Sequence, residues 1–140
     1  MVSGVSAISF ASNPIMRTQA VQKYQQQQNN DARQALINKN YRDIYAHESA
    51  HKAAGGPLAG AIVIETNEEG IPVGGHVAIM MPVLRPDNPQ KTIDDANTVV
   101  RAAMAPADPS GQDFRVAAQA RNIRAEAENI KQKKKIDYYA

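Results

Sequence analysis

Two histidines four residues apart, His47 and His51, lie near the end of a segment with a helical pattern of apolar residues. The segment runs from Asp31 to Ala54, and the Gly-Gly-Pro sequence that follows it stops the helix. At 100° per residue, His51 lies on the apolar line of this helix, and His47 and Glu48 flank that line. The motif therefore points to the interior of the fold, where two imidazoles and a carboxylate need partners.

The spacing of this His-Glu-x-x-His motif has a chemical reason. Positions i and i+4 of a helix lie one turn apart on one face, so two imidazoles can bind one Zn²⁺ at about 2.0–2.1 Å. Glu48 lies beside the metal without binding it and can take a proton from water that the metal activates. Random placement of the residues of this chain gives about 0.003 matches to the motif. We therefore expect zinc at His47 and His51, with Glu48 as the general base.

A catalytic zinc site takes a third protein ligand and keeps one position open. The remaining histidine, His76, follows Gly74 and Gly75 on a predicted strand, and we expect it to be the third ligand. Residues alternate across a strand, so this expectation depends on which face of the strand packs against the helix. If the other face packs inward, the ligand must come from the acidic residues of the turn or of the next helix: Glu65, Glu68, Glu69, Asp94 and Asp95.

The pattern of apolar and turn residues predicts an α+β fold, with the long motif-bearing helix, one β-hairpin and two further C-terminal helices. The hairpin strands are expected at residues 61–65 and 71–81. Residues 66–70 supply Asn and Gly for the turn between them. The glycine pair inside the second strand, Gly74 and Gly75, indicates a bulge or a close approach of two backbones.

The two C-terminal helices carry recognisable start signals. Asn88 is the expected N-cap of the first, and Pro89 is its first helical residue. The second follows a proline-rich break at residues 105–109, where Ser110 and Asp113 resemble a capping box. Apolar residues make up 43% of the chain and many are Ala, while Trp is absent. Such a core depends on close packing of helices, because small side chains bury little area each.

The domain boundaries follow from composition. Residues 1–30 form a flexible, Gln/Asn-rich N-terminal segment, and residues 1–13 within it look disordered. The Gln-rich part cannot bury a core, so it is either a linker or a solvated extension of the helix. Residues 31–135 form the metallopeptidase-like domain that carries the motif, and residues 136–140 form a tail.

Composition also excludes several classes of protein. The net charge of +2 makes nucleic acid an unlikely partner. The absence of Cys excludes a Cys-rich zinc module and a disulfide scaffold. No apolar run approaches the roughly 18 residues of a membrane span, and no secretory signal is recognised, so a cytoplasmic location is the default expectation. The lysines at 131 and 133–135 fit a solvated helix end.

From Tyr41 onward the sequence resembles the SprA-related family, whose members are taken to be zincin-like metalloproteases. The matching stretches are YRDIYAHESAHKAAGG from Tyr41, PVGGHV from Pro72, and VRAAMAPADPSGQDFRVAAQA from Val100 to Ala120. The resemblance implies a zincin-like peptidase with zinc held at His47 and His51 and with Glu48 as the base. In the family pattern Glu usually follows the two glycines; here that position is His76, and both residue types are good zinc ligands.

Four side chains are candidate contacts for the oxyanion or the substrate: Tyr41, Tyr45, Arg101 and Arg115. An arginine near the helix break could stabilise the oxyanion of a tetrahedral intermediate. In the alternative interpretation, Arg101 pairs with an acid while Gln112 and Arg115 are solvated. Asp113 then only caps a helix. For Tyr41, packing in the core is the alternative role.

The sequence therefore predicts a zinc-dependent hydrolase, a metallopeptidase that cleaves peptide bonds with metal-activated water and Glu48 as general base. Zn²⁺ is the expected cofactor, and a peptide or protein is the expected substrate. The alternative is a non-catalytic helical protein of binding or assembly, with a structural metal or none. Zinc with an open position favours the first function, and a closed four-ligand site favours the second. The identity of that substrate, the cleavage preference and the oligomeric state are not predicted.

Overall fold

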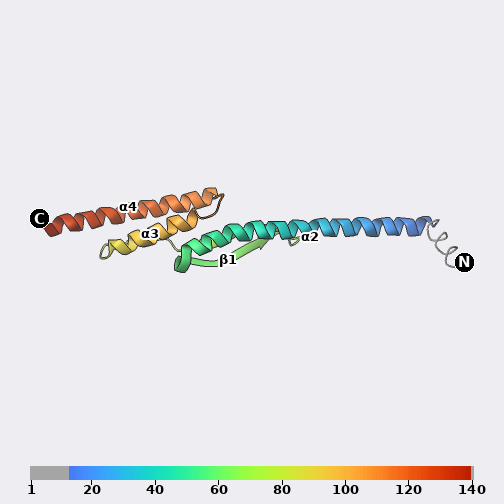
Figure 1. Ribbon diagram of the computed structural model, residues 1–140, viewed down its shortest axis with the longest axis horizontal. Coiled ribbons are helices and arrows are strands. Elements are labelled where there is room, and N and C mark those ends of the chain that lie inside the picture. The colour runs from blue at the N-terminus through green and yellow to red at the C-terminus, as the bar shows by residue number, and fades with distance from the viewer. Residues whose placement is uncertain (1–12, 140) are drawn as a thin grey trace. The chain divides into compact units, whose positions relative to one another are not determined.

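The computed structural model describes residues 13–139. The elements, in chain order, are α2 (Pro14–Gly55), a 3₁₀ turn η1 (Gly56–Leu58), β1 (Ala59–Thr66), β2 (Pro72–Ile79), α3 (Pro89–Ala103) and α4 (Gly111–Tyr139) (Figure 1). This is the predicted α+β architecture of one long helix, one hairpin and two C-terminal helices. The described residues divide into two compact units between Lys39 and Asn40, within α2. Most of the segment predicted to be disordered, residues 1–12, lies outside the described part.

Helix α2 begins at Pro14, earlier than Asp31, where the apolar pattern places its start. Asn13 Oδ1 accepts the N–H groups of the second and third helical residues, at 3.0 and 3.3 Å, and so caps the helix. No glycine or proline follows Pro14 until the last residue of the helix, and Gln is a good helix former. Residues 14–30 are exposed throughout, so the Gln-rich segment is the solvated extension of the helix and not a linker.

The hairpin follows α2 closely. Helix α2 ends at Gly55, where a methyl group would lie 2.8 Å from Ala59 Cβ, so only glycine allows so tight a reversal. In the turn between the strands, Asn67 Oδ1 accepts the backbone N–H groups of Glu69 (2.9 Å) and residue 71 (3.0 Å). Gly70 has a φ of 76°, which only glycine adopts readily. The turn residues therefore act as the sequence predicts.

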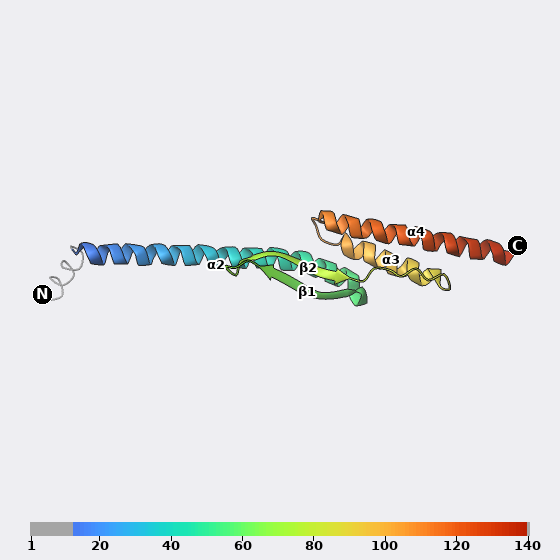
Figure 2. The ribbon, with the colours of Figure 1, turned by 180° about the vertical axis from the view of Figure 1, so that it is seen from behind.

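The hairpin lies alongside α2 in Figure 2, and two side chains of the helix hold it there. Asn40 Nδ2 donates to the carbonyl oxygen of Pro72 at the start of β2 (2.9 Å). For the other strand, Lys52 Nζ donates to the carbonyl oxygen of Gly60 in β1 (2.7 Å). The hairpin is thus fixed alongside the stretch of α2 that carries the two histidines.

Strand β2 makes its closest approach to α2 at Gly75. A methyl group on Gly75 would lie 2.6 Å from Ile44 Cγ2, 3.0 Å from the carbonyl oxygen of Val63 and 3.1 Å from Glu48 Cγ. The glycine pair was expected to mark a bulge or a close approach, and it marks a close approach at its second member. Glycine here lets the strand lie directly over the Glu48 side chain.

Helices α3 and α4 lie side by side and pack through small residues (Figures 1 and 2). Asn88 caps α3, since its side chain accepts the Lys91 N–H at 3.3 Å, and Pro89 is the first helical residue, as predicted. Small side chains allow two helix axes to approach closely, which the Ala-rich composition requires. The hydrophobic residues described with 0–1% exposure are Ala96, Val99, Ala102 and Ala103 of α3 and Ala117, Ala120 and Ala127 of α4.

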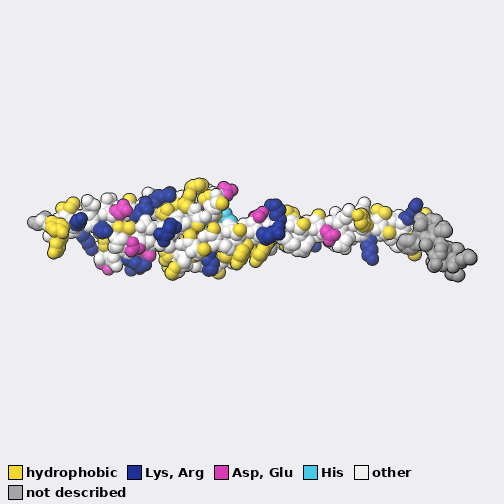
Figure 3. Space-filling view, viewed as in Figure 1, with side chains coloured by type: hydrophobic (Ala, Val, Ile, Leu, Met, Phe, Trp, Pro, Cys, Tyr) yellow, Lys and Arg dark blue, Asp and Glu magenta, His cyan; other side chains and the backbone are white. Residues whose placement is uncertain are grey.

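The surface is mixed in charge. Basic and acidic side chains are interspersed over the face shown in Figure 3, in keeping with the net charge of +2. Helix α4 continues through residues 136–139, which the sequence assigns to a tail, and its lysine-rich end is exposed. None of the described helices is both long and apolar enough to cross a membrane.

Candidate metal centre

The two motif histidines face each other on α2. Their Nε2 atoms lie 3.2 Å apart, and the rings meet edge to face with centroids separated by 4.9 Å. His51 is buried, with 4% exposure, and His47 is half-buried beside it. Glu48 is also buried, with 6% exposure. The motif therefore lies on the inward face of the helix, as its position on the apolar line predicts.

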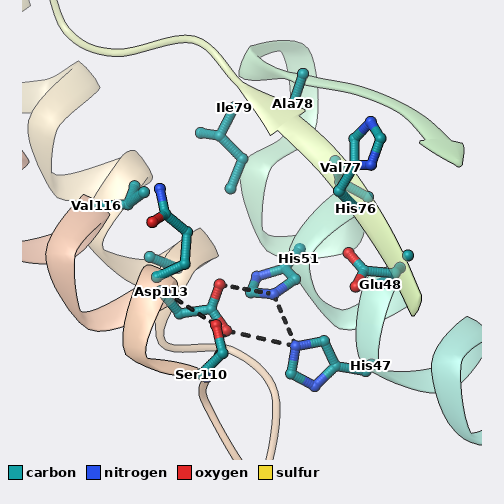
Figure 4. Close-up of a pocket in the computed structure, with 13 residues that line it drawn as sticks. His47, Glu48, His51, His76, Val77, Ala78, Ile79, Ser110, Asp113 and Val116 are labelled. Carbon is teal, nitrogen blue, oxygen red and sulfur yellow. Dashed lines mark hydrogen bonds and ion pairs between the residues drawn. The ribbon is translucent and has the colours of Figure 1, made fainter. Parts of the chain in front are cut away.

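Asp113, in the first turn of α4, brings a carboxylate to this pair (Figure 4). Its Oδ1 lies 3.3 Å from Nε2 of His51, and its Oδ2 lies 3.4 Å from Nε2 of His47. One ligand atom from each of the three residues lies within 4.8 Å of the other two. Within residues 13–139, His47, His51 and Asp113 are the group of His, Asp and Glu side chains that could bind a metal ion.

The ring of His51 is oriented by helix α3. Its Nδ1 lies 2.7 Å from the carbonyl oxygen of Ala102. A carbonyl only accepts, so Nδ1 carries the proton and donates, and Nε2 of the neutral ring keeps its lone pair for the cluster. The same carbonyl also accepts the Ala105 N–H at 3.4 Å, at the end of α3, so it serves both the helix end and the ring of His51.

Asp113 is held by the predicted capping box. The Ser110 N–H donates to Asp113 Oδ2 at 2.7 Å, and the Asp113 N–H donates to Ser110 Oγ at 3.1 Å. The same carboxylate therefore caps α4 and faces both histidines. Sequence reasoning assigned Asp113 only the capping role and did not consider it as a ligand. Its side chain is 14% exposed, which leaves it little freedom to turn away from the pair.

Glu48 lies in the same pocket but not in the metal-binding group. The pocket has a volume of about 430 Å³ and lies between β2, from Gly75 to Ile79, and the first turns of α4. In the described part of the chain, no hydrogen bond or ion pair joins the Glu48 carboxylate to another residue. Among these residues, every buried side-chain nitrogen or oxygen without solvent contact has a hydrogen-bond partner. Because the Glu48 oxygens have no such partner, they contact solvent. A carboxylate that is buried, unpaired and open to a pocket is typical of a catalytic base.

His76 lines the pocket as well, but on the exposed face of β2. Its side chain is 57% exposed, and its Nδ1 lies 3.2 Å from Glu65 Oε1 of β1. After it in the strand, Val77 and Ile79 are half-buried and Ala78 is exposed. The face of β2 that carries His76 therefore does not pack against the helix, which is the second of the two orientations considered from the sequence. The structure brings Asp113, and not His76, to the two motif histidines.

The acidic residues considered as alternative ligands lie elsewhere. Glu68 and Glu69 are exposed in the hairpin turn. On α3, Asp95 pairs with Lys91 at 2.6 Å and Asp94 accepts a hydrogen bond from a glutamine. None of them belongs to the metal-binding group of the described residues.

The four candidate oxyanion or substrate contacts do not line the pocket. Tyr41 and Tyr45 stack on each other with ring centroids 5.7 Å apart, and both are nearly half exposed, so Tyr41 is not a core residue. Arg101 donates to Thr98 Oγ1 at 3.3 Å. Arg115 donates to the side chain of a pocket residue, Gln112, which sequence reasoning had considered only as solvated.

Comparisons with known proteins find one relationship. No curated protein and no solved structure matches the chain. The model of the SprA-related family matches residues 11–136, which include the motif helix, the hairpin and nearly all of α4. The chain therefore belongs to the SprA-related family.

Proposed function

We propose that this protein is a zinc-dependent metallopeptidase in which His47, His51 and Asp113 hold the metal and Glu48 is the general base. The observation that carries the proposal is the convergence of two Nε2 atoms and one carboxylate beside a buried, unpaired glutamate in an open pocket. Membership of the SprA-related family supports the proposal only in that the match, over residues 11–136, includes these site residues.

The spacing of the three groups supports zinc. Ligands bound to tetrahedral zinc at about 2.0–2.1 Å lie about 3.3–3.4 Å from one another. The two Nε2 atoms lie 3.2 Å apart, and each lies 3.3–3.4 Å from a different oxygen of the Asp113 carboxylate, while one ligand atom from each residue lies within 4.8 Å of the others. Two imidazoles with one carboxylate form a donor set found in catalytic zinc sites. Because Nε2 of His51 and the Asp113 carboxylate both present lone pairs, a cation between them satisfies both.

The number of ligands supports a catalytic site over a structural one. Structural zinc is usually held by four protein ligands, whereas catalytic zinc has three and keeps one position for water or substrate. The described group offers three, and a pocket opens beside it. This is the observation that distinguishes the proposal from a non-catalytic helical protein with a structural metal.

The chain's own residues then carry the proton transfers. Zinc, when bound, polarises a carbonyl and makes water more acidic. The Glu48 carboxylate takes the proton of the attacking water and passes it to the amine that leaves, which is the double role of a general acid and base. Burial beneath Gly75 holds the Glu48 side chain in place, because its Cγ cannot move towards the strand. Asp113 and the ring of His51 are held by Ser110 and by the Ala102 carbonyl.

The proposal is tested by zinc content and hydrolysis of an unfolded protein, measured on the same preparations. Glu48→Gln should keep one zinc per chain and lose about 10²–10⁴ of the hydrolysis rate, because an amide cannot accept the proton. Asp113→Asn keeps an oxygen for the Ser110 N–H but loses the charge, so it should bind zinc much more weakly. His76→Ala is the matched control from the same pocket and should keep its zinc. Zinc-free parent protein, or equal zinc loss in the last two variants, contradicts the ligand set.

A further inference from the structure

We infer that Gln112 donates a hydrogen bond to the carbonyl oxygen of the substrate, and that Arg115 is the positioning residue that orients it. The inference rests on the proposed hydrolysis and names its oxygen-binding group. Gln112 lines the pocket and directly precedes the ligand Asp113 at the start of α4. Neither residue of this pair is needed for the metal site itself.

The orientation of the Gln112 amide follows from its contact with Arg115. Nε and Nη2 of Arg115 lie 3.1 and 2.9 Å from Gln112 Oε1. A guanidinium has donors only, so the amide oxygen must face Arg115 and the amide NH₂ must face away from it. Among residues 13–139, no hydrogen bond occupies that NH₂ group. Gln112 therefore offers two free N–H donors from a side chain that borders the pocket.

The same contact makes these donors stronger. A cation bound at the oxygen draws electron density through the amide, and hydrogen bonds arranged in a chain strengthen one another. The Gln112 amide is nevertheless neutral, so it does not repel a divalent metal as a guanidinium would. Arg115 itself does not line the pocket. Its positive charge thus acts on the pocket through Gln112.

Hydrolysis of an amide requires such a donor. Negative charge develops on the carbonyl oxygen in the transition state, and one fixed donor is worth about 10²–10³ in rate. Two other side chains of the pocket carry donors. His76 Nδ1 is paired with Glu65, and Ser110 Oγ is held in the cap of α4, where it accepts the Asp113 N–H. Gln112 differs from both because a neighbouring cation orients its amide and leaves the NH₂ group available.

The experiment uses the full chain loaded with zinc. Gln112→Met keeps the length of the side chain and removes both donors. It should lower kcat by about 10²-fold, with zinc content and KM within twofold of the parent. Arg115→Gln should lower kcat by about 10-fold in the parent and by nothing further in the Gln112→Met background, since it acts only through Gln112. Arg121→Gln, an exposed arginine of the same helix, is the matched control and should change nothing.

A second measurement does not depend on turnover. A peptide phosphonate has charged oxygens on a tetrahedral centre, and calorimetry should show about 10-fold weaker binding of it to Gln112→Met than to the parent. Parent protein without zinc overturns the proposed function and this inference together. Zinc-loaded Gln112→Met with parental kcat and parental phosphonate binding overturns only the role of Gln112. Additive losses in the double variant overturn the role of Arg115 as a positioning residue.

Discussion

Gly75→Ala is the substitution whose outcome the structure determines most sharply. The added methyl group would lie 2.6 Å from Ile44 Cγ2, 3.0 Å from the Val63 carbonyl oxygen and 3.1 Å from Glu48 Cγ. Side-chain atoms can yield by small rotations, but the Val63 carbonyl belongs to the backbone of the neighbouring strand. Relief therefore requires β2 to shift relative to both α2, at Ile44, and β1, at Val63.

The cost is that of an overpacked contact, about 1–3 kcal/mol. For a compact unit of the size of residues 40–140, this lowers the melting temperature by roughly 5–15 °C. The strand that moves covers Glu48, so hydrolysis should fall by more than the loss of folded protein explains. Zinc affinity should change little, because no metal ligand lies on β2.

Gly74→Ala is the matched control, one residue away on the same strand. A methyl group there would meet only Glu65 Oε2, at 3.9 Å, which is ordinary contact. Thermal unfolding of both variants, followed by circular dichroism without metal, separates packing from metal binding. Gly74→Ala should melt within about 2 °C of the parent. Equal melting temperatures for the two variants would refute the close approach of β2 and α2 at Gly75.

Two further predictions concern the metal centre. A chelator should lower the melting temperature of the zinc-loaded protein at pH 7.5. It should have a much smaller effect at pH 5, because protons compete there with the metal for the imidazoles. Identical melting curves with and without chelator at pH 7.5 would exclude a bound metal. Ser110→Ala should cost about 1 kcal/mol of stability through the lost cap, and should weaken zinc binding because Ser110 Oγ fixes the Asp113 N–H, although the Ser110 N–H still reaches the carboxylate. Ser110→Thr keeps the hydroxyl and should restore both, and a zinc affinity unchanged in Ser110→Ala would show that the cap does not support the ligand.

Local features of the fold were predictable because short-range chemistry decides them. Gly55 ends α2, Asn67 and Gly70 form the hairpin turn, and Asn88 caps α3, and each acts within a few residues of itself in the chain. The start of α2 was placed too late because the prediction followed apolar periodicity. An exposed helix needs no apolar stripe, only a cap such as Asn13 and the absence of breakers.

The face of β2 could not be predicted from the sequence. Residues alternate across a strand, so turning the strand over moves every inward side chain to the outer face and every outward one to the inner face. Both faces of β2 carry apolar residues, so burial alone does not decide between His76 and its neighbours. The deciding contact is steric: Gly75 is the residue that can approach Ile44 at the observed distance. The glycine pair carried this information, but it shows a close approach without showing which glycine makes it.

Asp113 was missed as a candidate ligand for a different physical reason. Its capping role is local and explains an acidic residue at that position without any metal. Its proximity to His51 depends on how α4 packs across a large separation in sequence, which periodicity does not report. A cap satisfies a carboxylate only in part, however, since each oxygen has two lone pairs. The two oxygens of Asp113 also lie 3.3 and 3.4 Å from Nε2 of His51 and His47.

The break between α3 and α4 therefore serves the site as well as the fold. The Ala102 carbonyl near the end of α3 accepts the Ala105 N–H at 3.4 Å and also contacts Nδ1 of His51. At the start of α4, Ser110 holds Asp113 against the same histidine. Because a break built only to reverse the chain requires neither contact with His51, these contacts agree with the proposed metal centre.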